Sequence, residues 1–403
     1  MNRSVSKEPG ATRVRTALAV LGILFLTASC DHATVSEPPG TEDPWTTASR
    51  DTDADWQIVQ AYIDQTEATD IFRSAAAARA ILGEGGRHEK TIEAATFLVN
   101  LTSFDRTTAL LPGIDQQVVA GAKALFAHAP NHEAWRRVLF EIGSFNQYAG
   151  SNGPTPPATD SFLQEMVSET DDPRLRAAAR YYLATGVMRS ANVLELTPED
   201  REGRRRRALG LASGLKAGVE QEEFLVPGFR ITEAKRTFAH AEADLVRRIH
   251  HATVGGTLPD LTGTRLDGSE ESLADYQGRV LLLDFWATWC APCLAALPDL
   301  RELVNRLPAD HFALLAISVD VDRDSVTEFF TWNVVSELLD KEPVPWANWH
   351  VGEQSALEWQ LEIDRFPTYV LADERGKILA RTSELSDEFL TLIERAVANS
   401  TTS

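Results

Sequence analysis

Two cysteines separated by two residues, Cys290 and Cys293, are the side chains of this chain best suited to do chemistry. They follow the apolar run 280–285 closely, which predicts a strand and then a helix that begins at the first cysteine. The free N–H groups and the dipole of a helix N-terminus favour a thiolate, so Cys290 is the expected nucleophile. Cys293 lies one turn further along, where we expect it to be more buried and to attack a mixed disulfide on Cys290. The pair therefore predicts a redox-active disulfide.

The same spacing also occurs in zinc sites and in structural disulfides. A zinc site needs two further ligands, commonly a second cysteine pair or a histidine pair at short spacing. The chain contains only three cysteines, and none of its nine histidines forms such a pair near the motif. The sequence therefore favours redox chemistry over these two alternatives, and it predicts no metal and no other cofactor.

Asp284 lies six positions before Cys290, inside the apolar run. A buried carboxylate without a partner is costly unless its pKa rises. A raised pKa suits Asp284 to accept the proton of Cys293 as that thiol attacks, and to return it later. The alternative interpretation is a strand residue that faces a solvated edge of the sheet.

Residues 254–400 resemble the thioredoxin superfamily, and specifically the TlpA-like or ResA-like thiol-disulfide reductases. Four landmarks carry the resemblance, and they occur in the expected order and at the expected separations. They are the lead-in 254–261, the segment 266–280, the block 283–293 around the two cysteines, and Arg365-Phe366-Pro367-Thr368. The resemblance implies an α/β domain in which helices flank a central mixed sheet.

The resemblance also implies roles for single residues. Cys290 corresponds to the attacking thiol, Cys293 to the resolving thiol, and Pro367 to a cis-proline whose loop presents its backbone to a bound peptide. Trp289 and Phe366 are the other expected substrate contacts, and Phe366 is bulkier than the valine or isoleucine common before this proline. The glutamate that some cytochrome c maturation reductases carry three residues after the second cysteine is an alanine here.

The N-terminus predicts where this chemistry takes place. Basic residues precede the short apolar stretch 17–26, and small residues then lead to Cys30. Residues 1–29 are predicted to be a secretory signal peptide. They resemble a bacterial lipoprotein signal in which Cys30 is lipidated, although Thr27 stands where leucine is usual. Ordinary cleavage and an uncleaved anchor are the alternatives, and Asp31 resembles the signal that retains some lipoproteins in the inner membrane.

Composition divides the remaining chain into three parts. Residues 30–54 are rich in proline, threonine, serine and acidic residues, and are predicted to be a disordered tether. Residues 55–252 are rich in alanine and carry apolar residues at helical spacing, which predicts an all-α domain of helical hairpins. The thioredoxin-like domain is expected at 253–403. The helical domain could bind partners or act as a structural spacer, and a net charge of −20 argues against nucleic acid as a partner.

These features together predict an extracytoplasmic protein disulfide reductase on the periplasmic side, anchored by lipidated Cys30 and favouring the inner membrane. The resemblance implies disulfide-bearing extracytoplasmic partners, such as apocytochrome c or metallochaperones, and a membrane electron donor of the DsbD or CcdA type. Two alternatives stay open. One is a disulfide oxidase or isomerase, and the other is a lipoprotein scaffold whose helical domain binds partners while the thioredoxin module senses redox state.

Overall fold

The computed structural model describes most of the chain beyond residue 51. The described residues are 52–64, 71–87, 89–101, 111–130, 132, 134–148, 157–194, 196–227, 233–330, 343–352 and 355–401. The predicted signal peptide, Cys30 and almost all of the predicted tether lie outside them. In the part that is described, no helix combines the length and apolar character needed to cross a membrane.

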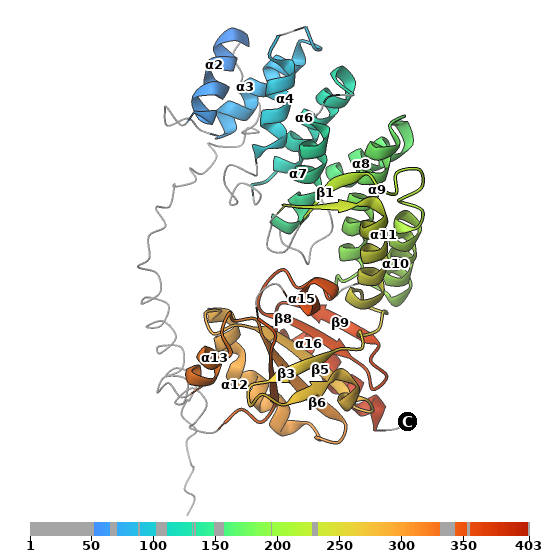
Figure 1. The fold of residues 1–403 in the computed structure, drawn as a ribbon. Coiled ribbons are helices and arrows are strands. Elements are labelled where there is room, and N and C mark those ends of the chain that lie inside the picture. The colour runs from blue at the N-terminus through green and yellow to red at the C-terminus, as the bar shows by residue number, and fades with distance from the viewer. Residues whose placement is uncertain are drawn as a thin grey trace, which may run out of the picture. The chain divides into compact units, whose positions relative to one another are not determined.

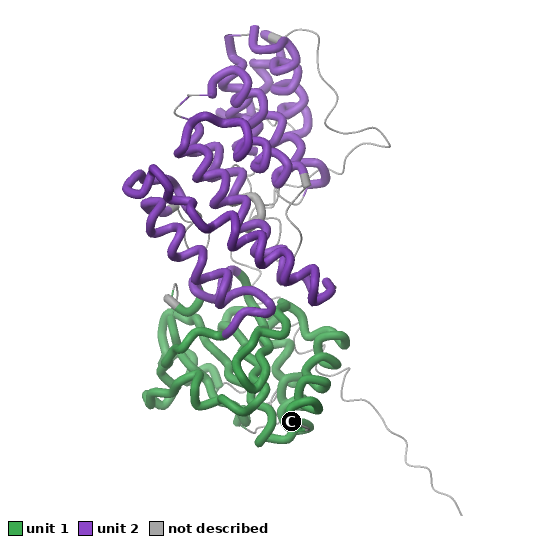
Figure 2. The backbone as a smooth tube through the Cα atoms, turned by 90° about the vertical axis from the view of Figure 1, so that its right-hand side faces the viewer, with its two compact units in different colours: residues 1–37, 258–358, 365–403 green, residues 38–257, 359–364 purple. Residues whose placement is uncertain are grey.

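The described residues form two compact units (Figure 2). One unit takes in Leu258–Glu358 and Arg365–Ser403. The other takes in the described residues from 52 to 257 together with Trp359–Asp364.

The second unit is predominantly helical (Figure 1). Its helices are α2 (Thr52–Ile63), α3 (Ile71–Gly83), α4 (Thr91–Val99), α6 (Ile114–His128), α7 (Trp135–Tyr148), α8 (Pro157–Glu169), α9 (Pro173–Ser190), α10 (Pro198–Ala212) and α11 (Phe238–Ala252). Helices close in sequence pack on each other, as α2 does with α3, α4 with α6, and α9 with α10. This arrangement confirms the expectation of helical hairpins, and α2 begins at Thr52, three residues before the predicted boundary.

Local sequence signals start two of these helices. Asp172 caps α9 by accepting a hydrogen bond from the Arg174 amide, and Thr197 caps α10 by accepting one from the Asp200 amide. A proline follows each cap at the first helical position, where no N–H is needed.

A short hairpin departs from the prediction that this part of the chain is wholly helical. Strands β1 (Glu223–Pro227) and β2 (Glu233–Thr237) pair antiparallel. Phe224 and Val226 are buried on one face, whereas Glu223 is exposed, and this alternation is typical of a half-buried strand. The ring of Phe224 stacks on Phe238 with centroids 4.2 Å apart. This aromatic contact stabilises the two strands. They are too short to be predicted from the alternation of apolar and polar residues alone.

Residues 359–364 contribute a buried ionic cluster to the helical unit. The carboxylate of Glu362 accepts hydrogen bonds from the Arg189 guanidinium at 2.9 and 3.1 Å, and it also pairs with Arg248. Arg248 in turn lies over the ring of Trp359, with its guanidinium carbon 4.6 Å from the ring centroid. Burial lowers the pKa of both arginines, and the carboxylate between them compensates their charge.

The first unit is built on a seven-stranded mixed sheet with the order β4-β3-β7-β6-β5-β8-β9. Figure 1 labels β3, β5, β6, β8 and β9 of this sheet. Its strands are β3 (Thr262–Arg265), β4 (Glu270–Ser272), β5 (Val280–Trp286), β6 (Phe312–Ser318), β7 (Ala347–His350), β8 (Thr368–Ala372) and β9 (Ile378–Thr382). Its helices are η3 (Leu273–Tyr276), α12 (Ala291–Arg306), α13 (Arg323–Phe329), α15 (Ala356–Gln360), which continues into Trp359 and Gln360 of the other unit, and α16 (Asp387–Ser400). The expected mixed sheet with flanking helices is confirmed.

Strand β5 lies inside this sheet, parallel to β6 and antiparallel to β8. Every residue of β5 and of β6 is buried. Continuous apolar runs suit such strands because helices cover both faces of a parallel pair. The chain leaves the carboxyl end of β5 and enters α12 after four residues, which places the two cysteines at this edge of the sheet.

A matched pair of glycine substitutions tests the packing of the helical unit. A Cβ at Gly143 in α7 would overlap the buried ring of Tyr182, whereas a Cβ at Gly203 in α10 would meet nothing within 4 Å. We expect Gly143→Ala to lower the free energy of unfolding by about 1–3 kcal/mol through overpacking. Gly203→Ala should raise it by up to about 1 kcal/mol, because alanine favours the helix. Urea denaturation followed by circular dichroism measures both, and equal effects would contradict the described packing.

Candidate active site

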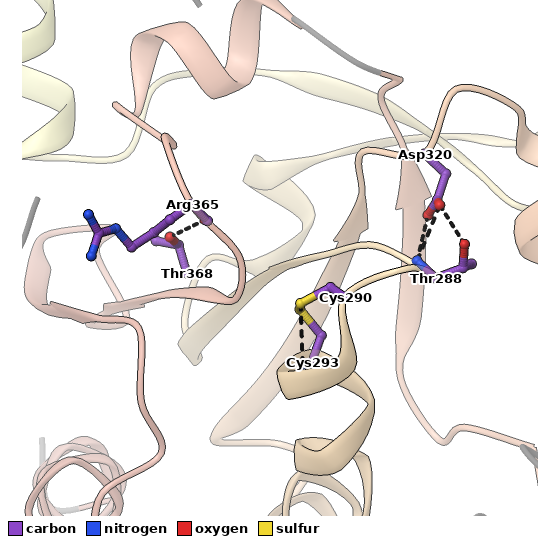
Figure 3. The surroundings of a disulfide bond; sticks show 6 residues. All are labelled: Thr288, Cys290, Cys293, Asp320, Arg365 and Thr368. Carbon is purple, nitrogen blue, oxygen red and sulfur yellow. Dashed lines mark hydrogen bonds between the residues drawn. A yellow bond between two sulfur atoms is a disulfide. The ribbon is translucent and has the colours of Figure 1, made fainter. Parts of the chain in front are cut away.

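Cys290 and Cys293 form a disulfide at the start of α12 (Figure 3). The sulfur atoms are 2.05 Å apart and the Cα atoms 5.3 Å apart. Cys290 is the N-cap of the helix, and its sulfur accepts a hydrogen bond from the Cys293 amide at 3.3 Å. Pro292 lies in the first turn, where its missing N–H costs no helical bond. In the reduced protein the same amide and the helix dipole favour the thiolate of Cys290.

The two cysteines differ less in burial than the sequence suggested. Cys290 is 5% exposed and Cys293 is 3% exposed. In this oxidised form the sulfur of Cys290 lies against the first turn of α12, where it accepts from the Cys293 amide.

The turn that precedes α12 carries an exposed aromatic side chain. The Cys290 amide donates to the Ala287 carbonyl at 3.1 Å, which closes a tight turn with Thr288 and Trp289 at its centre. Trp289 is 53% exposed, a large fraction for a tryptophan. Its ring meets Phe366 edge to face, with the centroids 5.7 Å apart. The structure thus brings together Trp289 and Phe366, two of the residues that the sequence assigned to substrate contact.

The third such residue, Pro367, follows a cis peptide bond between Phe366 and Pro367. Strand β8 begins at the next residue, Thr368, whose hydroxyl donates to the Arg365 carbonyl at 2.8 Å (Figure 3). This bond closes the loop around the proline. An aromatic ring and a proline loop next to the two cysteines can bind an extended peptide. A disulfide in that peptide would then lie within reach of Cys290.

Asp284 lies in the middle of β5, opposite Tyr369 of β8. It is 3% exposed, so the alternative of a solvated strand edge is wrong. Its Oδ1 has no hydrogen-bond partner among the described residues. Burial without compensating donors raises the pKa of Asp284 to about 7. A carboxyl group with this pKa can hold or release a proton near neutral pH.

Sequence reasoning missed one polar residue next to the turn, Asp320. It follows β6, and its carboxylate accepts hydrogen bonds from the amide and the hydroxyl of Thr288 (Figure 3). The sequence did offer one signal, because Asp320 directly follows the apolar run that forms β6, the strand parallel to β5. Such strands end at the same edge of a sheet, so residues that follow them gather there.

The structure shows no arrangement that would hold a metal at this site. Across the described ranges, no group of three or more histidine, cysteine, aspartate or glutamate side chains is placed to bind an ion. Cys290, Cys293 and Asp284 themselves can carry out thiol exchange and proton transfer.

The pH dependence of stability tests the raised pKa of Asp284. In the folded protein this carboxyl keeps its proton up to about pH 7, whereas in the unfolded chain it loses the proton near its ordinary value of 3.8. The unfolded state then binds fewer protons between these values, so the stabilisation is complete below about pH 4 and is lost as the pH rises through 7. Relative to Asp284→Asn, the oxidised wild type should lose up to about 4 kcal/mol over this range. Urea unfolding at several pH values measures the difference, and parallel profiles would contradict it.

Comparison with known proteins finds similarity to the C-terminal part of the chain. Residues 253–394 match the family model described as Redoxin. The ResA thiol-disulfide oxidoreductase of Geobacillus kaustophilus is 40% identical over 76 residues, which is 19% of this chain and 44% of the relative. That of Geobacillus thermodenitrificans is 30% identical over 130 residues, or 31% of this chain and 66% of the relative. The chain thus spans less than two thirds of either relative.

Solved structures also match part of this chain. A thioredoxin domain of a thiol-disulfide oxidoreductase from Bacteroides vulgatus is 26% identical and has a TM-score of 0.31, with coverage of 36% of this chain and 98% of that one. The matched family model and the strand order of the first unit agree on the same part of the chain. Residues 253–394 thus match the Redoxin family model, and ResA thiol-disulfide oxidoreductases are among the proteins that this chain resembles.

Proposed function

We propose that this protein is an extracytoplasmic, membrane-tethered thiol-disulfide oxidoreductase that reduces disulfides in partner proteins. The observation that carries the proposal is the pair Cys290 and Cys293 at the start of α12, close enough to form a disulfide. A Redoxin domain with relatives named thiol-disulfide oxidoreductases supports the same chemistry.

The first step is attack by the Cys290 thiolate on a disulfide of the partner. One sulfur–sulfur bond breaks and one forms, so the partner releases one thiolate and stays bound to Cys290 through the other sulfur. The amide of Cys293 and the N-terminus of α12 favour the thiolate that starts this step. The exposed ring of Trp289, the neighbouring Phe366 and the loop at Pro367 hold the partner during the exchange.

The second step is resolution by Cys293. Asp284 accepts the proton of the Cys293 thiol, and the resulting thiolate attacks the sulfur of Cys290. This attack forms the disulfide between Cys290 and Cys293 and releases the second thiolate of the partner. Two electrons have then passed from the protein to the partner. A further turnover requires an external dithiol, which we assign to a membrane electron donor of the DsbD or CcdA type.

The partners that fit this chemistry are extracytoplasmic proteins with disulfides, among them apocytochrome c and metallochaperones. The direction of exchange follows from the reduction potential of the dithiol relative to its partners. A strongly oxidising potential would instead assign the protein to disulfide formation or isomerisation.

Substitution of the second cysteine tests the catalytic cycle. In Cys293→Ala the first step proceeds and the second is blocked, so partner proteins should accumulate as mixed disulfides on Cys290. Non-reducing electrophoresis detects these adducts, and mass spectrometry identifies the partners.

The control for this experiment is Cys290→Ala, which should form no adduct and show less than one hundredth of the wild-type rate of disulfide reduction, because the nucleophile is absent. If both variants matched wild type in every assay, the catalytic role would be lost and a scaffold role would replace it.

The proposed anchor is tested at Cys30. Wild-type protein expressed in a bacterial cell should incorporate labelled palmitate and sediment with membranes. Cys30→Ala should lose the label and be released into the soluble extracytoplasmic fraction, since one lipid-modified residue is the proposed attachment. A Cys30→Ala variant that still sediments with membranes as wild type does would argue for an uncleaved anchor.

A further inference from the structure

A buried carboxylate supports the turn that carries the dithiol. Asp320 is 5% exposed, and its carboxylate accepts hydrogen bonds from the Thr288 amide at 3.1 and 3.2 Å and from the Thr288 hydroxyl at 2.6 Å (Figure 3). The hydroxyl of Ser318, which is fully buried, donates to the same carboxylate at 2.8 Å. The groups that donate to Asp320 are one amide and two hydroxyls. None of them carries a positive charge, so these bonds stabilise the anion without neutralising it.

The backbone of Asp320 is fixed as well. Its amide donates to the Ser318 hydroxyl at 3.2 Å. Nε2 of His350, at the end of β7, lies 2.8 Å from the Asp320 carbonyl oxygen, and because a carbonyl can only accept, this nitrogen carries the proton. Ser318 and His350 therefore fix the backbone of Asp320, and with it the position of the carboxylate.

The position of Thr288 gives this anion a connection to the nucleophile. Thr288 is a central residue of the turn that the Cys290 amide closes onto Ala287. Two residues span at most about 7 Å and a hydrogen bond adds about 3 Å, so the carboxylate lies within roughly 10 Å of the Cys290 backbone. The carboxylate thus acts on the turn through hydrogen bonds and on the sulfur of Cys290 through its charge.

We propose that Asp320 is a positioning residue of the dithiol, which fixes the turn before Cys290 and places behind it a negative charge that makes the dithiol more reducing. This inference rests on the proposed function and adds a determinant of its direction. A nearby anion disfavours the Cys290 thiolate, and the thiolate exists only in the reduced protein. The charge therefore favours the disulfide, and the reduced protein gives up its electrons more readily.

The size of the effect follows from Coulomb's law. A unit charge roughly 10 Å away, at an effective dielectric constant of about 20, changes the thiolate equilibrium about tenfold. The N-terminus of α12 acts on the same sulfur with the opposite sign, and the two contributions offset each other in part. Asp284, His350 and Tyr369 are the other titratable groups on strands β5 to β8, and the test leaves all three unchanged.

The test compares full-length wild type with Asp320→Asn, Thr288→Val and, as a control, Asp324→Asn, which removes an exposed carboxylate four residues further on. Each protein is equilibrated with reduced and oxidised glutathione. In this equilibrium two molecules of reduced glutathione convert the protein disulfide into the dithiol and form one molecule of oxidised glutathione. The measured quantity is the fraction of protein in the dithiol form. At a pH where Cys290 is ionised, Asp320→Asn should shift this equilibrium up to about tenfold toward the dithiol, equivalent to about 30 mV. The control should match wild type.

The pH dependence of Cys290 alkylation separates charge from packing. Asp320→Asn retains the shape of the side chain and should move thiolate formation to lower pH. Thr288→Val keeps the carboxylate of Asp320 but removes the hydroxyl that donates to it. In this variant the thiolate of Cys290 should form at the same pH as in wild type, or at a higher pH. If Thr288→Val moves thiolate formation to lower pH, loosening of the turn explains the effect and the inference is overturned, even where Asp320→Asn does not fold.

An Asp320→Asn variant that is folded and indistinguishable from wild type in both measurements also overturns the inference. In that case wild-type reduction of partner disulfides through Cys290 would still stand, so the proposed function would survive. By contrast, a Cys293→Ala variant that forms no mixed disulfides through Cys290 would remove the proposed function itself.

Discussion

The geometry of the candidate site depends on the burial of β5. This strand is hydrogen-bonded to β6 on one side and to β8 on the other, and both of its faces are covered. A strand held in this way cannot shift its register without moving the whole sheet. The turn at its carboxyl end and the first residues of α12 are therefore fixed relative to the sheet, and Cys290 occupies a defined place although it lies outside any strand.

The two buried carboxyl groups of this region illustrate how surroundings assign different properties to the same side chain. Asp284 lies among apolar neighbours, and its Oδ1 finds no donor among the described residues, so the protonated form is favoured and its pKa rises. Asp320 is almost as buried, but it accepts from one amide and two hydroxyls. Donors of this kind replace the water that burial removes. Asp284 is thus suited to exchange a proton, whereas Asp320 is held in place by its donors.

Sequence reasoning reached the features that local patterns encode. The apolar run before Cys290 predicted a buried strand and the helix start that follows it, and the order of four landmarks predicted the mixed sheet. The hairpin at β1 and β2 escaped because its strands are short and its main support is a contact between Phe224 and Phe238. Asp320 escaped because its partner, Thr288, is 32 residues away in sequence and adjacent only when β5 and β6 pair. Contacts of this type require the register of the sheet.

The hydrogen bond from the Cys293 amide to the sulfur of Cys290 has a spectroscopic consequence. In the oxidised protein this proton faces a neutral, weakly accepting sulfur, whereas reduction and ionisation would turn the same acceptor into an anion. A single backbone resonance, followed by ¹⁵N-edited nuclear magnetic resonance, would then report the electronic state of the neighbouring sulfur directly. It would do so without an added dye, in the intact protein and during exchange with a partner.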